Sequence, residues 1–380
     1  MSHIAVITRR RFLASAAAGA GTLALGDLAP TRAAARSGRA AGFRVPLDSV
    51  PHTRTWMAWP DSVTIWGRRL LAAAQADIAR IASTIAHYEP VVVLANRRST
   101  ADARSACGSA VEVIDDIPIN DCWMRDTGPI FRLNGRGGLD AIGLNFNAWG
   151  DKQRHNHDAL VARRIAARLG VSFTAAGLVT EGGAIETDGH GTLMATESSI
   201  INPNRNPGRT RTQLEAAMNA AYGASEVIWL KGIRGQDITD DHVDSTSRFT
   251  APATGMVQYP RQASDHNMWS NDERRQYRVL SHADSPDGTP IATTKLLGPT
   301  WSRIRQHRDN NFVDSYANYY VCNGAVICAQ FGDADADADA QAAATIGAAF
   351  PGRVIEPLNI DALGIGGGGI HCVTQQQPAP

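Results

Sequence analysis

Short β-like runs alternate with longer amphipathic helical runs along most of this chain, and this alternation restricts the possible folds more than any other feature. Past residue 42, pairs of strand-like runs precede single helices. Helices are predicted near residues 69–87, 157–169, 210–222, 265–280 and 338–350, where apolar residues recur at spacings of three and four. The pattern predicts an α/β protein built from ββαβ-like units. Periodicity alone leaves a doubly wound sheet and a circular arrangement both open.

The dipeptide Asn323-Gly324 separates two apolar runs and predicts a β-hairpin with a two-residue turn. In that register Cys322 faces Ala325, while Cys328 projects to the opposite side of the sheet, so the two cysteines are not expected to form a disulfide. The chain has five cysteines and no CxxC pattern, which gives a structural zinc site little support. The Asp-Ala repeat over residues 333–339 lacks the glycine turn and glutamate of a calcium loop, so we expect no metal there.

Charge and hydropathy exclude several classes of function. The 380 residues include 37 basic and 37 acidic side chains, so a nucleic-acid role has no electrostatic support. No apolar run reaches the roughly 20 residues of a membrane span, and we expect no stable membrane anchoring. The first 35 residues carry four arginines and one aspartate, so the remainder carries a net charge of −3. A mildly acidic body suits a cationic substrate.

The N-terminus has the pattern of an export signal. Residues 8–13, Thr-Arg-Arg-Arg-Phe-Leu, resemble the twin-arginine signature and precede an Ala/Gly-rich segment. We therefore predict a signal peptide and spacer over residues 1–41 and one folded domain over residues 42–380. The predicted location is periplasmic or secreted.

A run of four glycines ends just before Ile370, His371 and Cys372. Such a run has a large conformational entropy cost, which a simple connector would not require. We expect it where backbone must pass close to other atoms, and here that place lies next to a thiol. A phosphate-binding loop would need a Lys or Ser/Thr opening a helix, and none follows.

Three other segments place acids beside glycine or histidine. Asp126 precedes Thr-Gly-Pro, and Glu181 precedes two glycines. His242 and Asp244 are two residues apart, so on a strand both would project to one face. Together with Cys372 these residues supply a nucleophile, an acid/base group and several anions, a set suited to guanidinium hydrolysis. Carboxylates grip the planar cation, and a thiolate attacks its carbon.

These segments resemble those of the agmatine deiminase family, within the guanidine-modifying pentein superfamily. The resemblance runs from about residue 45 to the C-terminus. The matching segments are residues 55–60, 123–129, 181–183, 202–207, 242–244, 330–333 and 370–378. It implies a five-bladed α/β propeller of ββαβ modules with a central active site, and no metal or organic cofactor.

Carried over position by position, the resemblance assigns Cys372 as nucleophile and His242 as general acid/base. Asp126 and Asp244 would bind the guanidinium, and Glu181 would pair with the histidine and the substrate. Trp123 would form a pocket wall or pack in the core, and His371 is expected to be structural, because adjacent residues on an extended segment point oppositely.

The implied reaction converts agmatine to N-carbamoylputrescine and ammonia through a covalent thiouronium, as in polyamine metabolism. Deimination of peptidyl or free arginine remains an alternative, as do a non-catalytic guanidine-binding protein and amidino transfer. Retention of the thiol argues against pure binding. Asp240-Asp241 stands where the family commonly has Asn-Gly, which leaves the substrate open.

Overall fold

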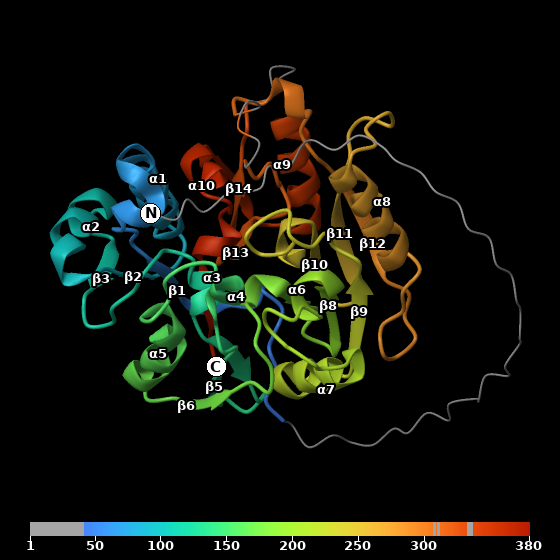
Figure 1. The fold of residues 1–380 in the computed structure, drawn as a ribbon, viewed down its shortest axis with the longest axis horizontal. Helices are drawn as coiled ribbons and strands as arrows, with labels where there is room; N and C mark the ends of the chain where they lie inside the picture. The colour runs from blue at the N-terminus through green and yellow to red at the C-terminus, as the bar shows by residue number, and fades with distance from the viewer. Residues whose placement is uncertain (1–41, 307–308, 310–311, 333–336) are drawn as a thin grey trace, which may run out of the picture.

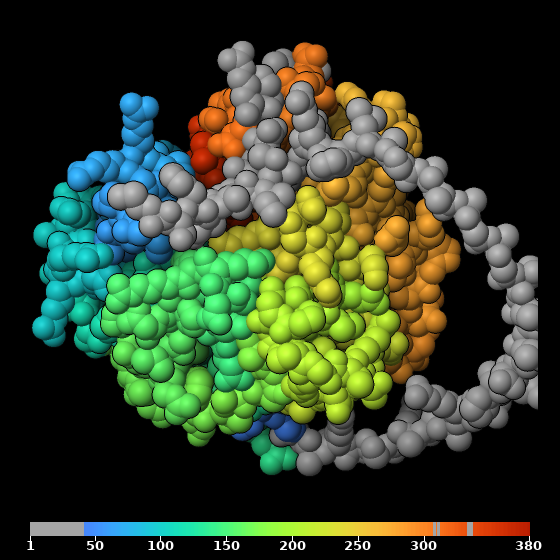
Figure 2. All heavy atoms as spheres, viewed as in Figure 1, coloured from blue at the N-terminus to red at the C-terminus, as the bar shows by residue number. Residues whose placement is uncertain are grey.

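The computed structural model describes residues 42–306, 309, 312–332 and 337–380. The predicted signal over residues 1–41 lies outside these residues, as does most of the Asp-Ala repeat. Within the described part, sixteen strands form five small sheets. Figure 1 shows the sheets following one another around a common centre, with the larger helices outside. In Figure 2 consecutive segments of the chain likewise fill neighbouring sectors of this face.

Four sheets have three strands each, an antiparallel pair followed by a parallel partner. Their strands are β4 (Ile130–Leu133), β5 (Leu139–Gly143) and β6 (Ser172–Ala175); β7 (Ile185–Thr187), β8 (Thr192–Thr196) and β9 (Glu226–Leu230); β10 (Ser247–Ala251), β11 (Thr254–Tyr259) and β12 (Ala292–Leu297); β13 (Tyr320–Cys322), β14 (Ala325–Ala329) and β15 (Val354–Leu358). Helices connect the parallel strands, because such a crossover must span the length of the sheet. The predicted ββαβ modules are confirmed.

The remaining sheet joins the two ends of the described chain. It has the order β16-β1-β2-β3, in which β16 (Gln375–Pro378) pairs antiparallel with β1 (His52–Ala58). β2 (Val91–Leu94) and β3 (Val111–Ile114) continue the sheet in parallel. This closure brings the C-terminal segment with Cys372 into the middle of the fold.

All five predicted helices form, with boundaries shifted by a few residues. They are α1 (Val63–Ile85), α5 (Val161–Leu169), α7 (Arg211–Tyr222), α8 (Met268–Leu280) and α9 (Asp337–Ala349). Shorter helices are α2 (Thr100–Cys107), α3 (Met124–Thr127), α4 (Ala148–Asp151), α6 (Glu197–Ile200) and α10 (Asp361–Ile365). No helix of the described residues has the length and hydropathy of a membrane span.

Local sequence explains several of these boundaries. α7 begins at a capping box, in which Thr210 and Gln213 satisfy each other's backbone N–H groups, and ends at Gly223 in a left-handed conformation. The predicted hairpin forms at Asn323-Gly324, with Cys322 paired to Ala325. All five cysteines lie in the described chain and are free thiols, as predicted for Cys322 and Cys328.

Candidate active site

The four-glycine run passes against two indole rings. A Cβ on Gly366 would lie 2.4 Å from the Trp66 ring, and a Cβ on Gly368 would lie 2.4 Å from the Trp123 ring. The two rings stack with centroids 5.7 Å apart. Only glycine permits this approach, so the expected close passage of the backbone is confirmed. Trp123 is buried, and its ring lies against Gly368 and Trp66.

Cys372 lies on a short 3₁₀ turn, η6 (His371–Val373), and is more exposed than both of its neighbours. Its Sγ is 4.0 Å from Asp244 Oδ2. Burial raises the pKa of the Cys372 thiol well above its usual range, and the charges of Asp244 and Asp126 raise it further. The thiol is therefore neutral at neutral pH.

Three predicted side chains converge on Gly183. A Cβ there would lie 2.7 Å from His242 Nδ1, 2.9 Å from Asp244 Oδ2 and 3.1 Å from Asp126 Oδ1. Gly183 also donates its backbone N–H to Asp126 Oδ1 at 3.0 Å. Its lack of a side chain thus leaves these three groups room to face one another.

His242 is held between carboxylates. Its Nε2 is 3.0 Å from Glu181 Oε2, and its Nδ1 is 3.8 Å from Asp126 Oδ1. Burial opposes the imidazolium charge, but Asp126, Glu181 and Asp244 outweigh it and raise the pKa of His242 to about 9. His242 is consequently protonated at neutral pH, as a general acid must be.

A buried arginine fixes Glu181. Arg205 donates from Nε to both Glu181 oxygens, at 2.9 and 3.2 Å, and from Nη1 to Asp240 Oδ2 at 2.6 Å. Lys152 also binds Asp240, at 2.9 Å. Asp240 and Asp241 both have positive φ angles, 64° and 68°. This left-handed pair turns the chain so that Asp240 reaches Arg205 just before His242.

The two aspartates differ in their partners. Asp126 accepts from Trp149 Nε1 at 2.9 Å, and burial raises its pKa to about 6. Asp244 Oδ2 lies 2.7 Å from His371 Nδ1, whereas Asp244 Oδ1 is buried without a hydrogen-bond partner among the described residues. A buried carboxylate oxygen without a partner is costly, and a guanidinium N–H would satisfy it.

Two expectations about local geometry were wrong. His242 and Asp244 do not share a strand face: Asp244 lies in a 3₁₀ turn, η4 (Val243–Ser245), that follows His242. His371 is not on an extended segment but on η6, where the turn points its ring at Asp244 Oδ2 and, at 3.2 Å, at Asp48 Oδ2. Backbone curvature in these turns, which residue spacing does not reveal, explains both differences.

Asp48, Glu186 and His371 form a group whose ligand atoms lie within 4.8 Å of one another, close enough for a metal ion. However, Arg248 lies 2.8 Å from Asp48 Oδ2 and 2.8 Å from Glu186 Oε1. The guanidinium thus supplies the positive charge that a cation would provide, and the donor set does not fit a metal.

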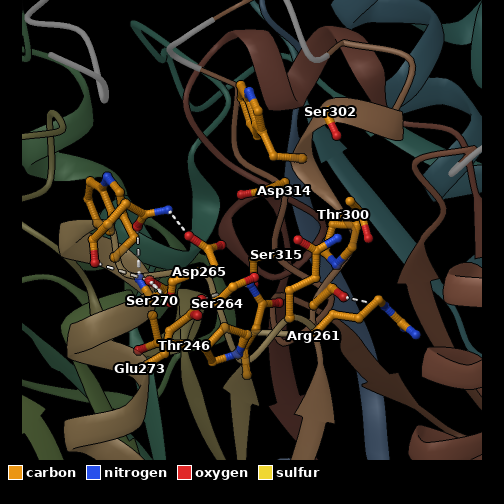
Figure 3. A pocket seen from close by; sticks show the side chains of 18 of the residues that line it. Thr246, Arg261, Ser264, Asp265, Ser270, Glu273, Thr300, Ser302, Asp314 and Ser315 are labelled. Carbon is orange, nitrogen blue, oxygen red and sulfur yellow. Dashed lines mark hydrogen bonds between the residues drawn. The ribbon is translucent and has the colours of Figure 1, made fainter.

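Figure 3 shows a polar cavity of about 310 Å³ formed by other residues of the described chain. Ser245 and Thr246, which directly follow Asp244, form part of its wall, together with Glu273 of α8 and Ser315. None of the six predicted site residues is among the described residues that line it. The cavity is therefore separate from the point where the thiol and the carboxylates meet.

A family model described as Porphyromonas-type peptidyl-arginine deiminase matches residues 44–378.

The chain belongs to this family.

Named relatives within the deiminases agree with this assignment. The agmatine deiminase of Stutzerimonas stutzeri is 33% identical, over 89% of this chain and 96% of its own. That of Ectopseudomonas mendocina is 33% identical, over 90% and 97%. A solved agmatine deiminase structure from Enterococcus faecalis superposes with a TM-score of 0.81 at 27% identity, covering 89% of this chain and 96% of that one. The predicted family resemblance and α/β pentein fold are confirmed.

For this deiminase, sequence reasoning missed a set of polar residues behind the six predicted ones. They are Asp48, Trp149, Arg205 and Asn318, each of which contacts a predicted site residue or His371, and Arg248, which binds Asp48. Arg205 lies in a segment that carries the family resemblance, so a signal for it was present. The others come from segments without a motif and are brought in by the fold alone.

Proposed function

We propose that this protein hydrolyses agmatine to N-carbamoylputrescine and ammonia through a covalent thiouronium on Cys372. The observation that carries the proposal is the convergence of His242, Asp126 and Asp244 on Gly183, with the Cys372 sulfur 4.0 Å from Asp244. The names of the relatives support the choice of agmatine.

In the first half-reaction Asp126 and Asp244 hold the guanidinium, and its charge lowers the pKa of the thiol, which releases its proton to solvent. The sulfur then attacks the guanidinium carbon. Protonated His242 gives its proton to the departing nitrogen, the C–N bond breaks, and ammonia leaves a cationic thiouronium.

In the second half-reaction neutral His242 takes one proton from water as the oxygen attacks the thiouronium carbon. The remaining hydroxyl proton passes to sulfur while the C–S bond breaks, giving the urea product and the free thiol. Glu181, fixed by Arg205, keeps His242 oriented and stabilises its imidazolium form in both half-reactions.

Replacing the proposed nucleophile tests this assignment. Cys372→Ser should abolish ammonia release while the protein stays folded by circular dichroism and still binds agmatine. Cys107→Ser is the matched control. Cys107 is a buried thiol in α2, distant from Cys372 in the sequence, and it has no role in the proposed reaction. Turnover that persists in Cys372→Ser would refute the covalent mechanism.

Deimination of peptidyl arginine is the second candidate, because the matching family model carries that description. Ammonia release should be measured in parallel with agmatine, free arginine and an arginyl peptide. The proposal requires the highest kcat/KM with agmatine; a higher value with the peptide would replace it with the second candidate.

We also propose export of the protein by the twin-arginine route. Its support is the Thr-Arg-Arg-Arg-Phe-Leu sequence over residues 8–13, which lies outside the described residues. Changing both Arg9 and Arg10 to Lys should leave active enzyme in the cytoplasm and remove it from the periplasm or medium. An unchanged distribution would contradict export by this route.

A further inference from the structure

Asn318 connects the proposed nucleophile to one of the substrate-binding carboxylates, and this inference rests on the function proposed above. Asn318 lies just before β13 and is 2% exposed. Its Oδ1 accepts from the backbone N–H of His371 at 3.0 Å and lies 3.4 Å from both the N and the Sγ of Cys372. One amide oxygen thus contacts both the backbone and the sulfur of the reactive turn.

The other end of the amide faces the second element of the site. Asn318 Nδ2 donates to the backbone carbonyl of Asp244 at 3.4 Å. Because one end meets N–H donors and the other meets a carbonyl, the orientation of the amide is fixed by its partners. Asn318 therefore links η6 to η4. The two turns also contact each other directly, through His371 and Asp244, which are 127 residues apart in the chain.

Two further features hold Asn318 in this position. Ser315 Oγ accepts from the backbone N–H of Asn318 at 3.2 Å and donates to the carbonyl of Ser245 at 2.6 Å. A Cβ on Gly369 would lie 2.5 Å from Asn318 Oδ1, so glycine is required for the amide to reach the turn. The last glycine of the run thus has a specific partner.

We propose that Asn318 is a positioning residue that fixes the sulfur of Cys372 against Asp244 and so sets the line of attack on the guanidinium carbon. The fold supplies the turn, but the turn alone leaves the thiol free to rotate about its χ1 bond. A displacement of about 1 Å in a reacting atom can cost roughly 100-fold in rate.

The decisive variant is Asn318→Ala, compared with Asn323→Ala as the matched control. Asn323 also makes a two-ended clamp, accepting from His52 N at 2.9 Å and donating to His52 O at 2.8 Å, but it lies at the β13–β14 hairpin. We expect Asn318→Ala to lower kcat for agmatine about 100-fold with KM within about threefold of the wild-type value. Asn323→Ala should keep both constants near wild type.

Thiol labelling separates positioning from general loss of structure. Chloroacetamidine carries an amidinium that copies the guanidinium, and its chloromethyl carbon alkylates a thiol with loss of chloride; iodoacetamide is neutral. Asn318→Ala should slow inactivation by chloroacetamidine about as much as kcat falls, while the rate with iodoacetamide stays unchanged or rises. Equal slowing with both reagents, or a kcat within threefold of wild type, would overturn the proposal.

Asn318→Asp keeps the size and the accepting oxygen, and serves if the alanine variant does not fold. It adds an anion beside the thiol, which already faces Asp244 and Asp126, so the pH midpoint of chloroacetamidine inactivation should move upward. An unchanged midpoint would contradict contact between Asn318 and the sulfur. Failure of the wild-type protein to release ammonia from agmatine would refute the proposed function instead, because the labelling needs only the thiol and the carboxylates.

Discussion

His242 and His371 occupy similar surroundings and nevertheless have opposite pKa shifts. Each lies beside a buried carboxylate, Glu181 or Asp244, within 3.0 Å. Burial disfavours the charged ring in both cases, yet the pKa of His242 rises to about 9 and that of His371 falls. The difference comes from the other charged residues that surround each histidine–carboxylate pair.

The arginines are placed differently around the two rings. Both rings face carboxylates on both nitrogens, and beside His242 the guanidinium of Arg205 is bound to Glu181 and Asp240. His371 is subject, after burial, to the positive charges of Arg125 and Arg248, which lower its pKa. A carboxylate–histidine pair thus becomes an acid/base group or a neutral support according to where the neighbouring guanidinium lies.

The largest expected effect comes from removing each ring in turn. His242→Gln should lower kcat/KM for agmatine by about 1,000-fold, because the departing ammonia and the attacking water both lose their proton-transfer partner. His371→Gln should cost only about 10-fold, mostly through KM, because it releases Asp244 from its orienting bond. Steady-state ammonia release gives kcat and KM for both variants. A loss in kcat for His371→Gln as large as that for His242→Gln would contradict the different roles assigned to the two histidines.

Replacing the paired carboxylates should sharpen the comparison. Glu181→Gln removes a negative charge beside His242, so the pKa of His242 should fall. The decrease of kcat at alkaline pH, the alkaline limb of the profile, should then begin at lower pH, and the activity at pH 8 should be roughly 10-fold lower. Asp48→Asn acts on the side of His371 and should leave the limb in place. Profiles of ammonia release against pH between 6 and 10 test this; coincident limbs for wild type and Glu181→Gln would contradict it.

A further expected effect is on stability. The folded pKa of His242, about 9, exceeds its ordinary value of 6.5, so its charge stabilises the fold fully below pH 6.5 and the contribution is lost as pH rises through 9. At about 1.4 kcal/mol per unit, the free energy of unfolding should fall by about 3 kcal/mol from this group. Urea unfolding at pH 7 and pH 10 should show most of this loss in wild type and His371→Gln, but not in His242→Gln.

The ββαβ modules were predictable from the sequence because each combines local signals: an apolar pair of runs, a turn and an amphipathic helix. β16 was not, because Gln375–Pro378 has no apolar alternation. Its glutamines are buried nonetheless, with Gln377 Oε1 accepting from Trp56 Nε1 at 3.1 Å and Gln376 Nε2 donating to Asp48 Oδ1 at 2.5 Å. β16 pairs with β1, more than 300 residues earlier in the chain, and no local pattern encodes this pairing.

The same division holds in the site. Cys372, His242, Glu181, Asp126 and Asp244 each lie within three residues of a glycine or of another site residue, so the sequence marks them. Asn318 and Arg248 carry no such mark, because their role depends on contacts with segments far away in the chain. The charges that give the two histidines opposite shifts therefore become visible only in three dimensions.

Acid-quenched mass spectrometry during the first turnover of agmatine tests the central claim most directly. The account predicts a transient adduct on the peptide that contains Cys372, with a mass increase equal to agmatine less ammonia, which disappears as N-carbamoylputrescine forms. Release of ammonia with no adduct on Cys372, or with the adduct on another residue, would contradict the account.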